Sequence, residues 1–289
     1  MPGLFVSPFT FAGRELDLSE ADYAVLGVPY DSSESYRTGS RFAPNAIREA
    51  SRGMEDYDML DGCDLLKIKL TDFGDINVSF GNYRETHRRI VASIKEILEH
   101  DAVPVSIGGE HTITHGVMSA YSKKPFALVF DAHLDLRREY IGEEFSHTCV
   151  TRRITELVGV ENVMVVGVRS AMKEELEEAR GMGLAFVDAE RAKEKDVLLE
   201  AILKKARDRD VYLSVDMDVL DPAEARGVCN PEPGGLSYRD FVSSLGFIKN
   251  VNIVGFDLVE VAPLYDSYTP VLAAKLILKV LSRIEHNKG

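Results

Sequence analysis

The chain has 289 residues, 45% of them hydrophobic, so it can bury a sizeable core as one large α/β domain or two small ones. Its 47 Asp and Glu outnumber 34 Lys and Arg, and the formal net charge of −13 argues against nucleic-acid binding and favours small cationic ligands. The three cysteines form no CxxC pair, which excludes a zinc ribbon of that type and fits a reducing cytoplasm. No apolar run reaches the roughly 18 to 20 residues that a membrane-spanning helix needs.

Predicted strands and helices alternate along the chain. The apolar segment 1–13 lacks a basic leader and a credible cleavage site, so we expect a packed terminal arm. Runs rich in Val, Ile, Leu and Phe predict about eight buried strands, at 23–28, 67–73, 103–107, 126–130, 162–168, 184–188, 211–217 and 252–258. Helices are expected to start near Pro44 and Ser237, to span 83–100, and to close the chain from Pro270 to about Glu285.

This alternation is typical of a parallel α/β protein. No long linker or repeat interrupts it, so we expect one domain over residues 1–289. Periodicity does not decide between a closed barrel and an open sheet. In either architecture, functional residues are expected beyond the carboxyl ends of the strands.

The sequence DAHLD directly follows the predicted strand 126–130 and carries the strongest signal of a functional site. Asp131, His133 and Asp135 alternate there, so in an extended backbone their side chains share one face. Because Asp and His are poor strand formers, three of them in alternation at a strand end indicate a functional role.

Two further polar motifs also follow predicted strands. SVDMDVLDP carries Asp216 and Asp218, again two residues apart, although an isolated Asp pair after a strand is most often a turn or a helix cap. In IGGEH, two glycines can make a tight turn that brings His111 to the same rim. The three motifs supply four carboxylates and two imidazoles without a thiolate, a ligand set that suits two Mn²⁺ or similar divalent ions better than structural zinc.

These motifs resemble those of the arginase, agmatinase and formimidoylglutamase family of ureohydrolases, which share GGxH, DAHxD and SxDxDxxDP. The resemblance extends over YRTGSRFAPNAIRE at 36–49 and GFDLVEVAP at 255–263, and so covers most of the chain. It implies a three-layer α/β/α sandwich with a central, mostly parallel sheet, and thereby an open sheet rather than a barrel. It also implies a homo-oligomer, a trimer or a hexamer.

The resemblance further implies two Mn²⁺ per subunit, for which Co²⁺, Ni²⁺ or Zn²⁺ could substitute. One ion is expected on His111, Asp131, Asp135 and Asp216, and the other on Asp131, His133, Asp216 and Asp218, with Asp131 and Asp216 bridging. A metal-bridging hydroxide then attacks the guanidinium carbon, Asp135 passes a proton to the leaving nitrogen, and urea is released.

Two more residues are assigned through the resemblance. Glu260 in DLVEVAP corresponds to the glutamate that holds the guanidinium, although a Glu after a strand can also be an ordinary surface residue. His147 in FSHTCV corresponds to a histidine that shuttles protons or contacts substrate, a role that suits an imidazole titrating near neutrality. An ordinary loop histidine is the alternative for His147.

The substrate expected from the resemblance is a guanidino amine, agmatine or N1-aminopropylagmatine, cleaved to urea and putrescine or spermidine in polyamine biosynthesis. The groups with which arginases hold the amino-acid head are not evident at 136–138 or 171–173. Formimidoylglutamase remains an alternative, because Arg137 could pair with a substrate carboxylate or instead form an intersubunit salt bridge. The sequence also leaves open arginase or guanidinobutyrase activity, a non-catalytic family member and a one-metal deacetylase.

Overall fold

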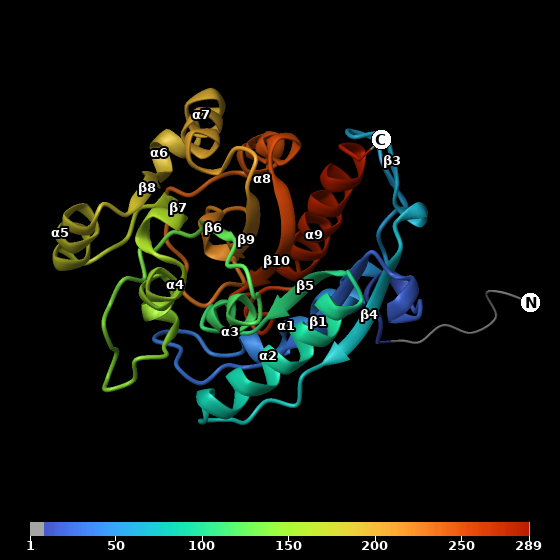
Figure 1. The fold of residues 1–289 in the computed structure, drawn as a ribbon, viewed down its shortest axis with the longest axis horizontal. Helices are drawn as coiled ribbons and strands as arrows, with labels where there is room; N and C mark the ends of the chain where they lie inside the picture. The colour runs from blue at the N-terminus through green and yellow to red at the C-terminus, as the bar shows by residue number, and fades with distance from the viewer. Residues whose placement is uncertain (1–8, 289) are drawn as a thin grey trace, which may run out of the picture.

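The structure, a computed structural model, describes residues 9–288 and contains one large parallel sheet (Figure 1). Eight strands lie in the order β4-β1-β5-β10-β9-β6-β7-β8, and all neighbouring pairs run parallel. Their bounds are β1 Tyr23–Val28, β4 Leu70–Asp75, β5 Val103–Gly108, β6 Phe126–Phe130, β7 Val163–Val168, β8 Ala185–Asp188, β9 Asp210–Asp216 and β10 Asn252–Val259. Because β4 and β8 are edges, the sheet is open, as the family resemblance predicted.

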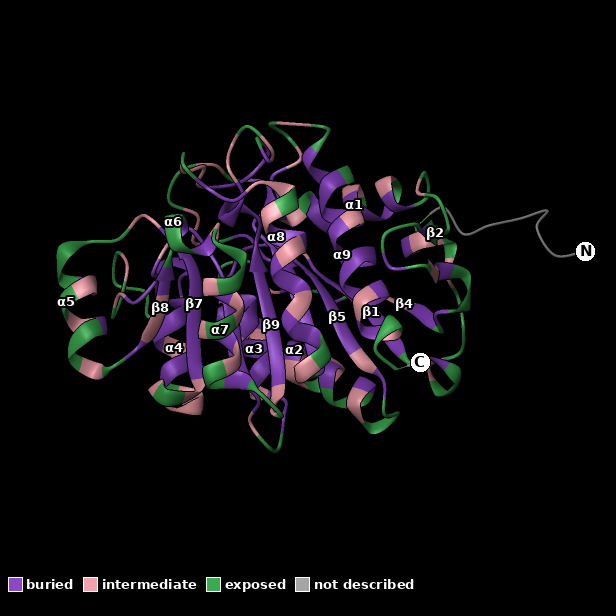
Figure 2. Ribbon diagram, turned by 90° about the horizontal axis from the view of Figure 1, so that it is seen from above, coloured by how far each residue is buried: buried purple, intermediate pink, exposed green. Residues whose placement is uncertain are grey.

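Helices cover both faces of this sheet, which confirms the three-layer sandwich (Figure 2). One face packs against α1 (Ala43–Ser51), α7 (Lys195–Ala206), α8 (Tyr238–Ser244) and α9 (Thr269–His286). The other face packs against α2 (Tyr83–Glu99), α3 (Ile113–Ser119), α4 (Val150–Val158) and α5 (Lys173–Met182). The short α6 (Ala189–Ala192) follows β8 at the edge of the sheet.

The alternation of side chains along each strand divides the core between the two faces. In β6, Phe126, Leu128 and Phe130 belong to the core beneath α9, whereas Ala127 and Val129 belong to the core beneath α2 to α5. All five residues are at most 1% exposed. This double burial explains why β6 is a continuous apolar run rather than an alternating one.

The predicted helix starts agree with the structure. Pro44 lies in the first turn of α1, where its missing N–H costs no hydrogen bond. Ser237 caps α8 by accepting from the Asp240 N–H, and the Asp240 side chain accepts a bond from the Ser237 N–H. Helix α2 buries the predicted stripe at Ile90, Ile94 and Ile97.

Two features differ from the sequence prediction. The strand predicted at 67–73 is shifted to Leu70–Asp75, because residues 65–67 form a 3-10 turn that Asp64 caps. A small antiparallel hairpin of β2 (Tyr57–Asp58) and β3 (Cys63–Asp64) was not predicted. Most of the arm expected at 1–13 lies outside the described residues, although Phe11 within it is fully buried. None of the described helices is long and apolar enough to cross a membrane.

Candidate metal centre and catalytic cavity

The predicted functional residues gather at the carboxyl ends of four adjacent strands. His111 follows β5, Asp131 follows β6, Asp216 ends β9 and Glu260 follows β10. These strands are consecutive in the sheet, in the order β5-β10-β9-β6. Motifs that are far apart in the sequence therefore meet at one edge, as expected for parallel α/β proteins.

The glycines before His111 are required by close packing rather than by a tight turn. A Cβ on Gly109 would lie 1.8 Å from the Tyr30 carbonyl oxygen, and one on Gly108 would lie 2.5 Å from Val259. Neither glycine has a positive φ. The need for glycine here thus comes from the close approach of Tyr30 and Val259 and not from a positive φ.

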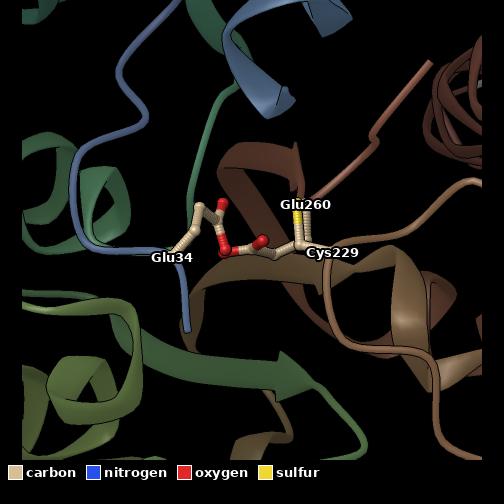
Figure 3. A group of neighbouring side chains, drawn as sticks. All are labelled: Glu34, Cys229 and Glu260. Atoms are coloured by element: carbon tan, nitrogen blue, oxygen red, sulfur yellow. The ribbon is translucent and has the colours of Figure 1, made fainter. Parts of the chain in front are cut away.

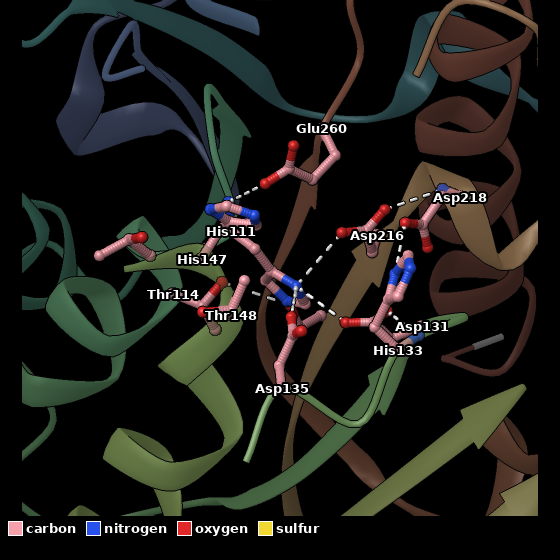
Figure 4. A network of polar contacts seen from close by, with 12 residues as sticks. His111, Thr114, Asp131, His133, Asp135, His147, Thr148, Asp216, Asp218 and Glu260 are labelled. Carbon is pink, nitrogen blue, oxygen red and sulfur yellow. Dashed lines mark hydrogen bonds and ion pairs between the residues drawn. The ribbon is translucent and has the colours of Figure 1, made fainter. Parts of the chain in front are cut away.

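One half of the candidate centre forms around His111 (Figure 4). Its Nδ1 lies 3.1 Å from Asp131 Oδ2, 3.3 Å from Asp216 Oδ2 and 3.9 Å from Asp135 Oδ2. All four side chains are at most 10% exposed. Three carboxylates facing one imidazole nitrogen at this depth are stable only with a cation or protons between them.

The other half forms around His133, whose Nδ1 lies 2.9 Å from Asp218 Oδ2 and 3.6 Å from Asp131 Oδ1. Asp131 therefore faces both histidines with different oxygens, which is the arrangement of a bridging carboxylate. His111, Asp131 and Asp135 form one group able to hold a metal ion, and Asp131, His133 and Asp218 form a second. The structure brings together all six predicted ligands.

Two of the six candidate ligands, however, do not reach the site through strand alternation, as the sequence had predicted. Asp135 has a φ of 48°, so the chain leaves the extended conformation before it. Asp218 lies in a 3-10 turn at Met217–Val219, where its N–H donates to Asp216 Oδ1 at 2.8 Å. The period-two argument is wrong for these two positions, and local turns bring their side chains to the site.

Behind His111 lies a hydrogen-bonded chain that the sequence analysis missed. Ser214 Oγ lies 3.0 Å from His111 Nε2 and donates to Asp257 Oδ1 at 2.6 Å. Asp257 also accepts bonds from the hydroxyls of Tyr212 and Thr114. Since the Ser214 proton points to Asp257, His111 donates to Ser214 from Nε2, and its Nδ1 faces the carboxylates.

The unpartnered atoms of the cluster fit a bound cation. His111 Nδ1 and Asp131 Oδ2 are buried without a hydrogen-bond partner among residues 9–288. Burial, followed by the charges of Asp218 and Asp131, raises the pKa of Asp216 well above its ordinary value. Burial opposes protonation of His111, but Asp131 and Asp216 outweigh it and raise its pKa. The bare site thus retains protons, whose place divalent ions can take on a hard oxygen and nitrogen ligand set.

A cavity of about 300 Å³ opens onto this centre. It is bordered by five carboxylates and one guanidinium, at Asp135, Glu175, Asp216, Asp218, Glu260 and Arg137. His133 and His147 also line it, together with Ser170, Ala171 and Met172. The excess of carboxylates favours a cationic ligand.

Glu260 is 2% exposed and has a φ of 65°, a conformation that non-glycine residues rarely adopt. Its Oε1 accepts the His111 N–H at 2.6 Å, whereas Oε2 has no hydrogen-bond partner in the described chain. The alternative of an ordinary surface glutamate is therefore wrong. One oxygen holds the carboxylate in place and the other remains free to bind.

His147 also borders the cavity, in a 3-10 turn before α4. Its Nδ1 lies 3.3 Å from Ser33 Oγ and its Nε2 lies 3.1 Å from Ser35 Oγ. Burial, together with the charges of His133 and His111, lowers the pKa of His147 to about 4. The imidazole is therefore neutral at physiological pH, and the argument from titration near neutrality is wrong in this structure.

The loop after β1 forms a wall of the site and was not predicted to do so. Glu110 is fully buried and accepts the N–H groups of Ser32 and Ser33 at 2.6 and 2.7 Å. This clamp brings Ser35 to the cavity and Glu34 beside Glu260. Asking which polar residues follow every predicted strand, including 23–28, would have found this loop.

Arg137 lines the cavity, as the formimidoylglutamase alternative requires. Its Nε lies 3.8 Å from Glu175 Oε2, and its guanidinium lies over the Tyr140 ring. Glu175 is fixed in turn by the N–H groups of Leu136 and Met172. Arg137 therefore already has an anionic partner within its own chain.

Fold and site together define an open parallel α/β protein with a candidate carboxylate and imidazole metal centre at the carboxyl edge of its sheet. A model of the Arginase family matches residues 21–282, and the chain belongs to this family of ureohydrolases.

Two relatives and one solved structure show the closeness of this relationship. The chain is 40% identical to an agmatinase of Bacillus cereus over 271 residues, 91% of each chain. It is 37% identical to the N(1)-aminopropylagmatine ureohydrolase of Thermococcus kodakarensis over 265 residues, 89% of each chain. The crystal structure of an agmatine ureohydrolase of Thermoplasma volcanium superposes with a TM-score of 0.90 at 36% identity, covering 98% of this chain and 96% of that one.

Proposed function

We propose that this chain is an agmatinase-type ureohydrolase with two Mn²⁺, which cleaves agmatine or N1-aminopropylagmatine to urea and putrescine or spermidine. The observation that carries the proposal is one acidic cavity lined by Glu260 and by four of the six candidate metal ligands, His133, Asp135, Asp216 and Asp218. The relatives named agmatinase and N(1)-aminopropylagmatine ureohydrolase support it.

The metal ligands proposed are His111, Asp131, His133, Asp135, Asp216 and Asp218, with Asp131 shared between the two groups. A bound metal pair would supply a nucleophilic hydroxide at neutral pH. Glu260 would orient the guanidinium through its free Oε2, because its Oε1 is occupied by the His111 N–H.

Two residues of the cavity wall are proposed to handle protons. Asp135 lines the cavity beside the cluster and is placed to carry a proton from the attacking water to the leaving nitrogen. His147 is neutral and fixed by Ser33 and Ser35, so it can accept a hydrogen bond or a proton at the cavity wall.

The rest of the cavity favours an amine over an amino acid. Ala171 and Met172 offer no side-chain hydrogen bonds for an amino-acid head, and the nearby Glu175 is anionic. Arg137, the one guanidinium on the wall, is turned to Glu175. A substrate carboxylate would therefore meet mostly like charge.

The test is urea release by Mn²⁺-loaded protein from agmatine, N1-aminopropylagmatine, 4-guanidinobutyrate and arginine, with formamide release from formimidoylglutamate in parallel. We expect a kcat/KM for a guanidino amine about 100-fold or more above that for arginine, since burying an unpaired carboxylate costs several kcal/mol. Formamide from formimidoylglutamate, or no hydrolysis of any of these compounds, would overturn the proposal.

A matched pair of variants tests the role of Glu260. Glu260→Gln removes a charge-assisted hydrogen bond of about 1.5 to 3 kcal/mol, so kcat/KM for the guanidino amine should fall about 10- to 150-fold. Glu177→Gln makes the same change on the exposed side of α5 and should leave kcat/KM unaltered. Equal effects of the two substitutions would exclude a direct contact between Glu260 and the guanidinium.

A further inference from the structure

A second cluster of metal-ligating groups lies next to the cavity, formed by Glu34, Cys229 and Glu260 (Figure 3). Glu34 belongs to the loop after β1, Cys229 to the segment between β9 and α8, and Glu260 to the end of β10. One ligand atom from each of the three residues lies within 4.8 Å of the other two. Neither the six predicted metal ligands nor the proposed mechanism uses Glu34 or Cys229.

Two carboxylate oxygens of this cluster are buried and unsatisfied. Glu34 Oε1 accepts the Ser40 hydroxyl at 2.9 Å and Glu260 Oε1 accepts the His111 N–H, so each carboxylate is held by one oxygen. The other oxygens, Glu34 Oε2 and Glu260 Oε2, are buried without a hydrogen-bond partner in the described chain. Cys229 is fully buried beside them. A buried group of this kind requires a cation or protons.

The spacing of the three donors is compatible with a single metal ion. Zinc binds carboxylate oxygens at about 2.0 to 2.2 Å and thiolate sulfur at about 2.3 Å, so two ligand atoms on one ion lie at most about 4.5 Å apart. Because the three donor atoms lie within 4.8 Å of one another, their separations are compatible with one bound metal ion.

We propose that Glu34, Cys229 and Glu260 form a separate binding site for a thiophilic divalent cation of the Zn²⁺ type. Two carboxylates and one thiolate suit zinc better than manganese, because sulfur selects the softer ion. The Cys229 thiol releases its proton to solvent as the ion binds. Of the three residues, Glu260 also lines the cavity.

Occupation of this site would inhibit the enzyme. The ion takes the free Oε2 of Glu260, the same oxygen proposed to orient the guanidinium. Zinc at this site and the cationic substrate therefore compete for one carboxylate. This consequence rests on the proposed function, whereas the metal site itself does not.

The site can be tested without any activity measurement, by titrating Co²⁺ into protein that already holds two equivalents of Mn²⁺. The His and Asp cluster contains no thiolate, so a thiolate-to-cobalt charge-transfer band in the near ultraviolet reports on a cysteine ligand. We expect the band to saturate at about one equivalent, to vanish in Cys229→Ser and to persist in Cys63→Ser, a half-buried cysteine on β3. Absence of the band, or its persistence in Cys229→Ser, would refute the site.

Glu34→Gln provides a second variant that keeps the shape of the side chain and the thiol, should Cys229→Ser fold poorly. Loss of one anionic ligand should weaken Co²⁺ binding about 10-fold or more, as read from the same band. Glu144→Gln, on the exposed loop before His147, serves as its control. Equal Co²⁺ affinity in the two variants would contradict the assignment of Glu34.

The inhibitory consequence is tested by Zn²⁺ added to the Mn²⁺-loaded enzyme at several agmatine concentrations. We expect Zn²⁺ to compete with agmatine, and its apparent affinity as an inhibitor should fall about 10-fold or more in Cys229→Ser. Each variant is compared with its own rate in the absence of Zn²⁺. If the protein hydrolyses no guanidino compound but shows the cobalt band, the proposed function fails and the metal site stands. If hydrolysis occurs without the band, the metal site fails alone.

Discussion

Removing the Ser214 hydroxyl should weaken metal binding although Ser214 is not a ligand. In Ser214→Ala, His111 loses the acceptor at 3.0 Å from its Nε2, and Asp257 loses the donor at 2.6 Å. Asp257 keeps its bonds from Tyr212 and Thr114, so the larger loss falls on the His111 side chain, which is 1% exposed. An unsatisfied buried N–H costs about 1 to 3 kcal/mol, which corresponds to about 5- to 150-fold in metal affinity.

The assay is Mn²⁺ binding by calorimetry to protein freed of metal, with urea release measured at saturating Mn²⁺. Ser244→Ala is the control, because Ser244 is equally buried in α8 and bonds only to the Phe241 carbonyl oxygen in the described structure. We expect weaker Mn²⁺ binding in Ser214→Ala alone, with turnover largely restored at high Mn²⁺. A change below about twofold in Ser214→Ala would refute the idea that this hydroxyl orients His111.

Three further predictions concern stability. Lys279→Met removes the buried ammonium that lies 2.9 Å from Asp58 and 2.7 Å from Asp61, although Asp61 keeps Arg283 at 3.1 Å. The free energy of unfolding in urea should fall by about 3 to 5 kcal/mol, and a loss below about 1 kcal/mol would contradict this. Burial, followed by the charge of His87, lowers the pKa of His115 to about 4, so unfolding takes up a proton and stability falls between about pH 6.5 and pH 4. His115→Gln should remove up to about 3 kcal/mol of that pH dependence, and identical pH profiles would disprove it. Chelation of the metals should lower the melting temperature, since a ligand at a thousandfold excess over its Kd stabilises by about 4 kcal/mol, and an unchanged melting curve would argue against the centre.

The sheet could be predicted from the sequence because parallel strands buried on both faces are short, continuous apolar runs. Phe126–Phe130 is such a run, and its ends agree with the structure. The β2 and β3 hairpin could not be found in this way, because its strands have two residues each. Buried charges hold the hairpin to α9, where Lys279 bonds Asp58, and charged residues carry no hydrophobic pattern.

Of the site, the gathering of the candidate ligands at one edge of the sheet could be predicted and their local geometry could not. Asp131 and His133 follow a strand and face a common centre, as alternation suggests. Asp135 and Asp218 reach the same centre through a left-handed residue and a 3-10 turn, which a rule for extended chains does not describe. The lowered pKa of His147 could not be predicted from the sequence either, because it depends on burial and on charges from distant segments.

The least predictable part of the site, the loop after β1, is bound by a residue within a recognised motif. Glu110 precedes His111 in the sequence and is fully buried, and its two oxygens bond Ser32, Ser33 and Thr112. Ser33 in turn bonds the N–H of His147. Within the GGEH motif, Glu110 thus binds the loop that carries Glu34, and the next residue, His111, is a candidate metal ligand. The position of Glu34 is therefore coupled to the candidate metal centre, because Glu110 and His111 are adjacent in the chain.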